Sequence, residues 1–308
     1  ALMAWVKRIS GWGRDSARDL YGCGGVVFCG CCDNENIGTP DSVGFGFTGA
    51  AAWLALILWR HYEYTRDGAF LRNDLYPFMR EIAEFYKGYL IEKDGFLLCP
   101  FGSSPEVQVV RGDKKSFLAS AATIDIELSR ELFKNLIGAC EIIGEDAGEY
   151  REIYKKLPLP KIRTDGTISE FWEDYVPADP GHRHRSLLVG LCPGTRISPA
   201  LTPDWADAAY QTILSRLKNE DAMSIGMTYA LDAQLLARLG KGNEAYERIN
   251  RYAQVHLLRN GLSTINDYSG RLGGQIWFKG HKLFQIEACI GIGGAIADML
   301  LSDREGYL

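Results

Sequence analysis

The stretch LYPFMREIAEFYKGYL at residues 75–90 has a clear helical signature. Its apolar side chains recur at intervals of three and four residues, which places them on one face of an α-helix. They are Leu75, Phe78, Met79, Ile82, Phe85, Tyr86 and Tyr89. Asp94-Gly95 follows and predicts the turn that ends this unit. The stretch therefore predicts a helix that buries one face.

Similar patterns account for most of the remaining chain. They predict helices at residues 2–21, 50–64, 121–143, 147–155, 204–217, 224–239, 243–257 and 285–301. Residues 157–202 contain six prolines and are expected to be mostly loop, of a length that usually serves a function. Residues 260–282 are glycine-rich and irregular, with room for a short strand pair. Because strand signals are few, we predict an all-α protein, with residues 1–308 forming a single domain.

Composition and charge exclude several classes of protein. Of the 308 residues, 46% are hydrophobic and 24% are charged, which is ordinary for a globular protein with a large core. A net charge of −5 without a basic stripe argues against a nucleic-acid partner. The longest nearly apolar run, residues 47–59, is shorter than the roughly 18 residues that a membrane span requires. Neither a nucleic-acid partner nor a membrane span is therefore predicted.

Four of the eight cysteines cluster near the N-terminus, at Cys23, Cys29, Cys31 and Cys32. A structural zinc site usually has two spaced cysteine pairs, or one pair followed by a spaced histidine pair. Here two cysteines are adjacent and no second pair follows, so no metal site is predicted. Small buried side chains in a glycine-rich turn are the preferred interpretation, and a metal protein is the alternative.

Five short motifs place acids, imidazoles or guanidinium groups beside aromatic residues. In chain order they are Ser104-Pro105-Glu106, Thr123-Ile124-Asp125, Glu170-Phe171-Trp172-Glu173-Asp174, His182-Arg183-His184 and Phe284-Gln285-Ile286-Glu287. Hydrolysis of a sugar–sugar bond needs two carboxyl groups that face each other across the substrate. The sequence contains no Gly-x-Ser-x-Gly elbow, phosphate-binding loop or His-Glu-x-x-His motif. The motifs therefore predict a glycosidase, or a protein descended from one.

The order of these motifs resembles the α/α-toroid catalytic domain of glycoside hydrolase family 95. Gly49-Ala50-Ala51-Ala52-Trp53, Tyr64-Thr65-Arg66-Asp67, Cys192-Pro193-Gly194 and Ala237-Arg238-Leu239 add to the likeness, which runs from about residue 17 to residue 301. The family comprises inverting α-L-fucosidases and related α-L-galactosidases. The resemblance implies an α/α toroid, a glycan or oligosaccharide substrate, and no cofactor. A complete toroid has twelve helices against the nine predicted, so either some segments are merged or the first hairpins are missing.

Glu106 matches the family's general acid in motif position. It also follows Pro105 in a loop beside Phe101, where loss of water would favour the protonated carboxyl that an acid catalyst needs. Glu287 matches an aspartate that helps to activate the attacking water. The alternatives are a solvated loop glutamate for Glu106 and favourable placement near a helix N-terminus for Glu287. We expect the two carboxyl groups to meet across one pocket.

Six further residues are predicted to bind or orient the substrate. They are Arg183, His184, His182, Trp172, Glu170 and Asp125. Arginine and histidine suit adjacent sugar hydroxyls, and His182 would orient the loop that carries them. An aromatic ring beside an acid suits a sugar platform, and Asp125 would be an acid behind the site. The alternative is that the acids tie the proline-rich loop to helix ends.

Several positions depart from the family pattern. Glu287 is one methylene longer than the family's aspartate, Leu187 replaces a histidine and Cys29 replaces another. The family's Asn-x-Asn pair, which polarises water, is expected upstream of Ala1, as is a β-rich domain of the same polypeptide. The compartment is left open, and an upstream export signal would place the protein outside the cytoplasm. The second hypothesis is therefore a hydrolytically impaired carbohydrate-binding protein.

Overall fold

The computed structural model describes residues 2–28, 30, 46–219, 224–265 and 283–301. They fall into two compact units, which are described separately. Unit 1 comprises Ala1–Lys161 and Ser169–Ala178, and unit 2 comprises Ile162–Ile168 and Asp179–Leu308. The sequence predicts a single domain over residues 1–308. This division into two compact units does not test that prediction.

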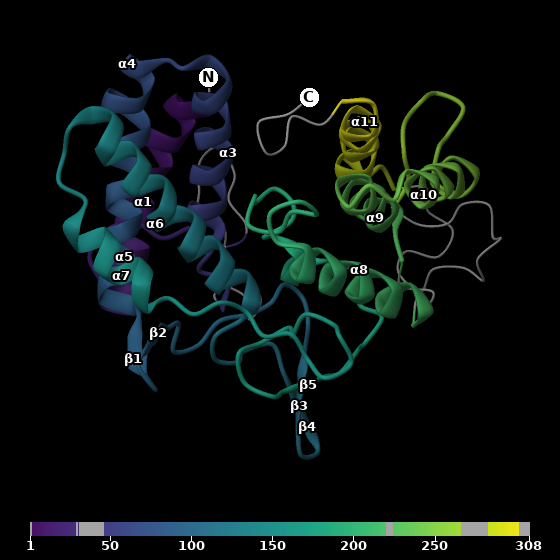
Figure 1. Ribbon diagram of the computed structural model, residues 1–308, viewed down its shortest axis with the longest axis horizontal. Coiled ribbons are helices and arrows are strands. Elements are labelled where there is room, and N and C mark those ends of the chain that lie inside the picture. Colours follow the sequence, from purple (N-terminus) through teal and green to yellow (C-terminus); the bar gives the residue numbers. More distant parts are fainter. Residues whose placement is uncertain (1, 29, 31–45, 220–223, 266–282, 302–308) are drawn as a thin grey trace. The chain divides into compact units, whose positions relative to one another are not determined.

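Both units are mainly helical (Figure 1), which confirms the predicted all-α class. Unit 1 contains α1 (Leu2–Tyr21), α3 (Ala50–Thr65), α4 (Gly68–Phe70), the π-helix η1 (Leu71–Leu75), α5 (Tyr76–Tyr89), α6 (Thr123–Ile143) and α7 (Gly148–Lys156). Unit 2 contains the 3₁₀-helix η2 (Ser186–Leu188), α8 (Pro203–Lys218), α9 (Gly226–Arg238), α10 (Gly242–Val255) and α11 (Ile286–Leu300).

Five short strands in unit 1 were not predicted. β1 (Ile91–Lys93) pairs antiparallel with β2 (Phe96–Leu98), with Glu92 opposite Leu97. β3 (Val109–Arg111) pairs antiparallel with both β4 (Lys114–Ser116) and β5 (Val176–Pro177). None of these strands is longer than three residues, and an alternating apolar pattern cannot be recognised over so short a stretch.

The helix before α5 begins earlier than expected. Arg66 ends α3 in the left-handed conformation, close to the predicted end of that helix at residue 64. Asp67 Oδ1 then accepts hydrogen bonds from the backbone N–H groups of Ala69 and Phe70, both at 3.0 Å, and so caps a new helix. This helix runs through α4 and η1 into α5, whose apolar face is buried as the sequence predicts.

Helix α6 forms the centre of unit 1, packing against α3, α5 and α7. Its inner stripe of Ile124, Leu128, Leu132 and Leu136 is at most 2% exposed. Burial of each such side chain contributes about 1.5–3 kcal/mol, so this helix carries much of the stability of the unit.

An extended segment, residues 26–28, lies between α1 and α5. Val26 donates its N–H to Glu81 O at 3.0 Å, and Val27 donates to Gly13 O at 3.2 Å. The approach is so close that a Cβ at Gly25 would overlap the backbone of α5 at Glu81 and Phe85. Glycine is therefore required at position 25 by space as well as by its φ of +77°.

We expect Gly25→Ala to destabilise unit 1 by more than about 3 kcal/mol, because the clash involves backbone atoms that cannot rotate away. Gly22→Ala is the matched control, since Gly22 also has a positive φ (+65°) but nothing lies near its missing Cβ. The control should lose only about 1–2 kcal/mol from left-handed strain. Urea unfolding of both variants measures the difference, and equal losses would show that residues 26–28 do not pack as described.

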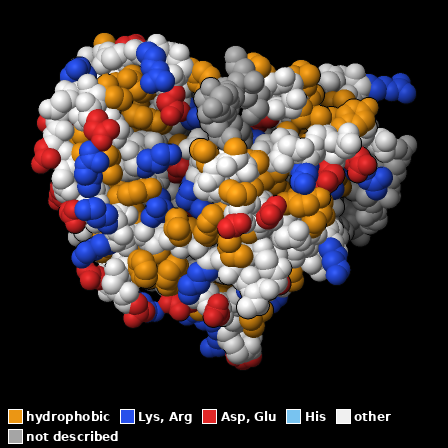
Figure 2. All heavy atoms as spheres, in the orientation of Figure 1, with side chains coloured by type: hydrophobic (Ala, Val, Ile, Leu, Met, Phe, Trp, Pro, Cys, Tyr) orange, Lys and Arg blue, Asp and Glu red, His pale blue; other side chains and the backbone are white. Residues whose placement is uncertain are grey.

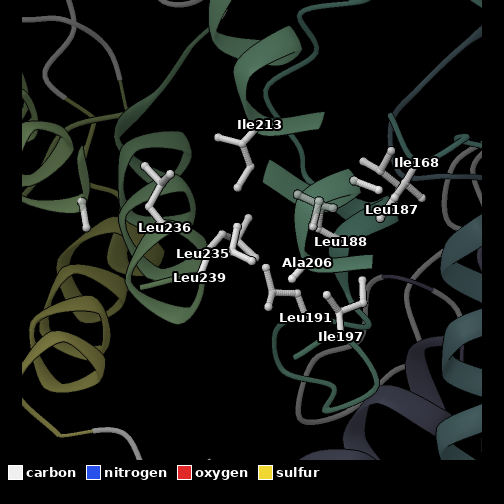
Figure 3. Packing of buried hydrophobic residues seen from close by; sticks show 13 residues of the cluster. Ile168, Leu187, Leu188, Leu191, Ile197, Ala206, Ile213, Leu235, Leu236 and Leu239 are labelled. Atoms are coloured by element: carbon white, nitrogen blue, oxygen red, sulfur yellow. The ribbon is translucent and has the colours of Figure 1, made fainter. Parts of the chain in front are cut away.

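The core of unit 2 includes a loop (Figure 3). Residues Leu187, Leu188, Leu191 and Ile197, from η2 and the loop after it, pack on apolar side chains of α8 and α9. Helix α9 also packs against α10 and α11. Leu187, which replaces a family histidine, is 2% exposed within this core. The predicted loop at residues 157–202 is therefore largely irregular, as expected, but firmly packed.

On the face shown in Figure 2, acidic and basic side chains are interspersed with apolar ones. None of the helices in the described ranges is both long and apolar enough to span a bilayer.

Candidate active site

Glu106 occupies a tight turn in unit 1 between Gly102 and strand β3. Gly102 exchanges two hydrogen bonds with Ala119, at 2.7 and 2.9 Å, which fix the chain before the turn. Within the turn, Val107 donates its N–H to Ser104 O at 2.6 Å. Glu106 is half-buried and lies on a short loop that these hydrogen bonds anchor.

The first and third motifs of the sequence meet beside this turn. Ser104 Oγ donates a hydrogen bond to Glu170 Oε1, and both residues are at most 5% exposed. The backbone oxygen of Glu170 accepts a hydrogen bond from Thr123 N at 3.0 Å, at the start of α6. Thr123 Oγ1 also donates to Ser169 O at 2.7 Å. Glu170 therefore ties the turn of Glu106 to the N-terminus of α6.

Asp125 lies in the first turn of α6 and has no exposed surface. Neither carboxyl oxygen has a hydrogen bond of good geometry, and the nearby Thr48 hydroxyl only partly offsets the burial. Burial therefore raises the pKa of Asp125 well above its usual range, and that of the Cys99 thiol nearby as well. A Cβ at Gly102 would overlap Asp125 Oδ2, so the acid packs directly under the chain that leads to Glu106.

The position of Asp125 favours its predicted place behind the site. A carboxyl group with a raised pKa stays protonated and neutral, which is how a buried acid without a cationic partner is tolerated. Its role toward a substrate stays a prediction.

We expect Asp125→Asn to remove one component of the pH dependence of stability. Above about pH 4, folded wild-type protein holds one proton more at Asp125 than the unfolded chain does, because burial raises the folded pKa. Its free energy of unfolding therefore falls as pH rises, by about 1.4 kcal/mol per pH unit until the folded pKa is passed. Asparagine cannot titrate, so this fall is absent from the variant.

Urea denaturation between pH 5 and pH 8 measures the slope. Asp113→Asn, at an exposed hairpin position, serves as the control and should keep the wild-type slope. A wild-type slope in Asp125→Asn would show that this carboxyl is ionised in the folded protein.

Trp172 packs against the β1–β2 hairpin and a neighbouring lysine. Its ring meets Phe96 edge to face at a centroid distance of 5.4 Å, and Lys161 Nζ lies 4.4 Å from its centroid. Its backbone N–H donates to Ala121 O at 2.9 Å. These contacts fix the ring in unit 1 and cover part of it. The alternative of a structural residue thus gains support, and the sugar platform stays a prediction.

The His182-Arg183-His184 segment begins after a turn in unit 2. Gly181 donates its N–H to Asp179 Oδ1 at 2.9 Å, and His182 donates to Asp179 O at 3.3 Å. Arg216 on α8 donates to the carbonyl oxygen of Pro180 at 3.3 Å. The turn is therefore anchored to α8 before the histidines begin.

His182 is buried and neutral. Burial, and then the adjacent charges of His184 and Arg183, lower the pKa of His182 to about 2. The backbone N–H of His184 donates to His182 Nδ1 at 3.2 Å, so this ring nitrogen serves as an acceptor. The two imidazoles meet edge to face at 5.2 Å. This geometry suits the predicted role of His182, which is to orient the loop.

Arg183 and His184 differ in exposure. Arg183 is 6% exposed, and its Nη1 lies 3.4 Å from His182 Nε2, whereas His184 is partly exposed. A planar fork and an imidazole on one short segment can donate to adjacent oxygens of a sugar. Their contact with a substrate stays a prediction.

A buried charge network behind this segment was not predicted. Arg185 forms a two-pronged ion pair with Asp232 on α9, with Nε–Oδ1 at 2.7 Å and Nη2–Oδ2 at 3.1 Å. Arg248 on α10 donates to Asp232 Oδ2 at 2.8 Å. Arg185 adjoins a recognisable motif, but Asp232 is 47 positions away and carries no signal of its own.

Glu287 lies in the first turn of α11 in unit 2 and is exposed. The residue before the helix, Gln285, is anchored: its Oε1 accepts a hydrogen bond from Met227 N at 2.7 Å, and its N–H donates to Ser263 O at 3.1 Å. Glu106 and Glu287 belong to different units, and their predicted approach across one pocket stays a prediction.

The remaining candidates lie outside the described residues. These are Cys29, Cys31 and Cys32. Within the described ranges, no three histidine, cysteine, aspartate or glutamate side chains are grouped as metal ligands would be.

Comparison with known proteins gives one consistent result. The family model described as "Glycosyl hydrolase family 95 catalytic domain" matches residues 1–300. α-L-Fucosidase 2 of Arabidopsis thaliana is 33% identical over 309 residues, covering 97% of the chain and 36% of that protein. A probable α-fucosidase A of Aspergillus niger is 27% identical over 265 residues, which cover 82% of the chain and 31% of that protein. The chain thus spans about a third of the length of the curated relatives that it matches.

Proposed function

The chain belongs to glycoside hydrolase family 95, and from this premise we propose that it is the catalytic domain of an inverting glycosidase. The substrate proposed is an oligosaccharide with a terminal α-linked L-fucose, or the related L-galactose. Two relatives named as fucosidases support the choice of sugar. The observation that carries the proposal is the Ser104–Glu170 contact, because it brings two acid-bearing motifs together beside the predicted catalytic acid.

The proposed reaction takes place in one displacement. Glu106 donates its proton to the glycosidic oxygen as the bond from that oxygen to the anomeric carbon breaks. A water molecule attacks the anomeric carbon from the opposite face and gives up a proton to Glu287. Inverting enzymes keep their two carboxyl groups roughly 6.5–9.5 Å apart so that this water fits between them. Proton exchange with solvent then restores both carboxyl groups.

Other residues are proposed to hold the sugar. Arg183 and His184 donate to its hydroxyl groups, and His182 fixes the segment that carries them. Glu170 and Trp172 line the approach to Glu106, with Asp125 as a neutral acid behind it. Contacts that strengthen as positive charge develops on the sugar ring would contribute most to the rate.

The parent polypeptide is proposed to be longer than this chain. The chain spans about a third of each relative, which supports a longer parent polypeptide. That the further part is a β-rich domain upstream rests on the family resemblance alone. With an export signal, the protein would act outside the cytoplasm. A hydrolytically impaired sugar-binding protein is the second candidate, because Glu287 is longer than the family's aspartate. Sugar binding without turnover would identify it.

We expect Glu106→Gln to lower the release of L-fucose from a fucosylated oligosaccharide by about 10²–10⁴-fold, because the amide cannot donate the proton. The loss should be far smaller with 2,4-dinitrophenyl α-L-fucoside, whose leaving group needs no protonation. Measurement of kcat/KM for both substrates separates lost acid catalysis from lost folding. The matched control is Glu152→Gln, which removes an exposed charge paired with Lys155. Equal losses on the two substrates, or no loss, would exclude Glu106 as the acid.

A further inference from the structure

Asp232 is a fully buried carboxylate that serves two arginines. Its side chain is 0% exposed, that of Arg185 is 2% exposed and that of Arg248 is 13% exposed. Arg185 binds both carboxylate oxygens through its planar fork, which fixes direction as well as distance. Arg248 also stacks over the Tyr229 ring at 4.1 Å. The position of the carboxylate is therefore determined from two neighbouring helices, α9 and α10.

Arg185 transmits this position to the segment before it. Its Nη1 donates to the backbone oxygen of His182 at 2.5 Å and lies 3.5 Å from that of His184. These two carbonyl groups flank Arg183 on both sides. A single guanidinium group thus holds the backbone of the predicted sugar-binding segment from within the protein.

Helix α9 is a rigid base for such a support. It packs against both α10 and α11, and its Leu235 and Leu236 are buried in the core of unit 2. A buried ion pair often contributes little net stability, since apolar side chains of similar size can replace it. Such a pair does fix the orientation of the two side chains, because a buried charge is stable only while it contacts its partner.

We propose that Asp232 is a positioning residue for the sugar site. Asp232 holds Arg185, and Arg185 holds the segment from which Arg183 and His184 reach the sugar. This role rests on the proposed function. Asp232 itself does not touch the substrate. Its loss should therefore act on the protein only through the His182–His184 segment.

A double-mutant cycle between Asp232→Asn and Arg183→Ala tests this coupling in the full polypeptide. Asp232→Asn alone should raise the KM for the fucosylated oligosaccharide about tenfold or more, since small misplacements of binding groups have large effects. In the Arg183→Ala background, the same change should raise KM by a smaller factor than it does in wild type, because only the contribution of His184 then still depends on the position of the segment. A full additional loss in that background, or no loss in the single variant, would overturn the proposal.

Asp298→Asn is the matched control. Asp298 pairs with Arg238 at 2.8 Å and also accepts a hydrogen bond from Gln234, so it links α11 to α9 through residues outside the His182–His184 segment. It should leave KM unchanged. If Asp232→Asn does not fold by circular dichroism, Arg185→Lys replaces it in the cycle, since lysine keeps the charge but cannot form the fork. The same non-additivity with Arg183→Ala is expected.

The design separates this inference from the proposed function. If the wild-type protein releases no sugar, the proposed hydrolysis is wrong, and the Kd for L-fucose replaces KM in the same cycle. A loss of binding in Asp232→Asn that is smaller in the Arg183→Ala background would still support the positioning role of Asp232. Equal Kd values for wild type and Asp232→Asn would reject it.

Discussion

The arrangement of unit 1 around Glu106 depends on a ladder of backbone hydrogen bonds at the start of α6. Ala121 donates its N–H to Cys99 O at 3.1 Å and accepts from Trp172 N at 2.9 Å. Thr123 donates to Glu170 O on the same side. Three segments far apart in the sequence are thereby aligned beside one helix terminus. Because buried backbone groups need partners, none of the three segments can shift without leaving such groups unpaired.

Side-chain contacts add to these backbone hydrogen bonds and hold the turn of Glu106 in place. The Ser104–Glu170 hydrogen bond joins the turn of Glu106 to the third segment, and Asp125 packs against Gly102 in the first. A neutral acid is tolerated at this fully buried position because it carries no charge. In unit 2, charged groups hold a loop in place instead: Arg185 in the loop pairs with Asp232 on α9. Both units thus present loop residues from a rigid helical base, which is how functional loops are commonly held.

The sequence predicts the helices well because their signals are local. Apolar spacing locates α1, α3 and α6 to within about two residues, and Asp67 could have revealed the early start of α4 through its capping position. The five strands were missed because two or three residues show no periodicity. Their pairing depends instead on the turns that join them and on the ladder at α6.

Some residues of the candidate site can likewise be predicted from the sequence, and others cannot. The motifs of Glu106, Glu170 and the two histidines stand out in the sequence because each combines several polar or aromatic residues. Roles for Glu106 and Glu287 came from resemblance to a family and not from spacing. The partnership of Asp232 with Arg185 could not be predicted, because helix α9 shows an isolated aspartate that reads like any solvated polar residue. Its burial follows only from the packing of α10 and of the loop after His184 against that helix.

We propose above all that this domain hydrolyses an α-L-fucosidic bond in one inverting step. Proton NMR of the sugar released in the first minutes of the reaction, before mutarotation equilibrates the two anomers, tests it most directly. The account predicts that β-L-fucose appears first from the α-linked substrate. Initial release of α-L-fucose would contradict the account, because retention requires a covalent intermediate and two carboxyl groups held closer together.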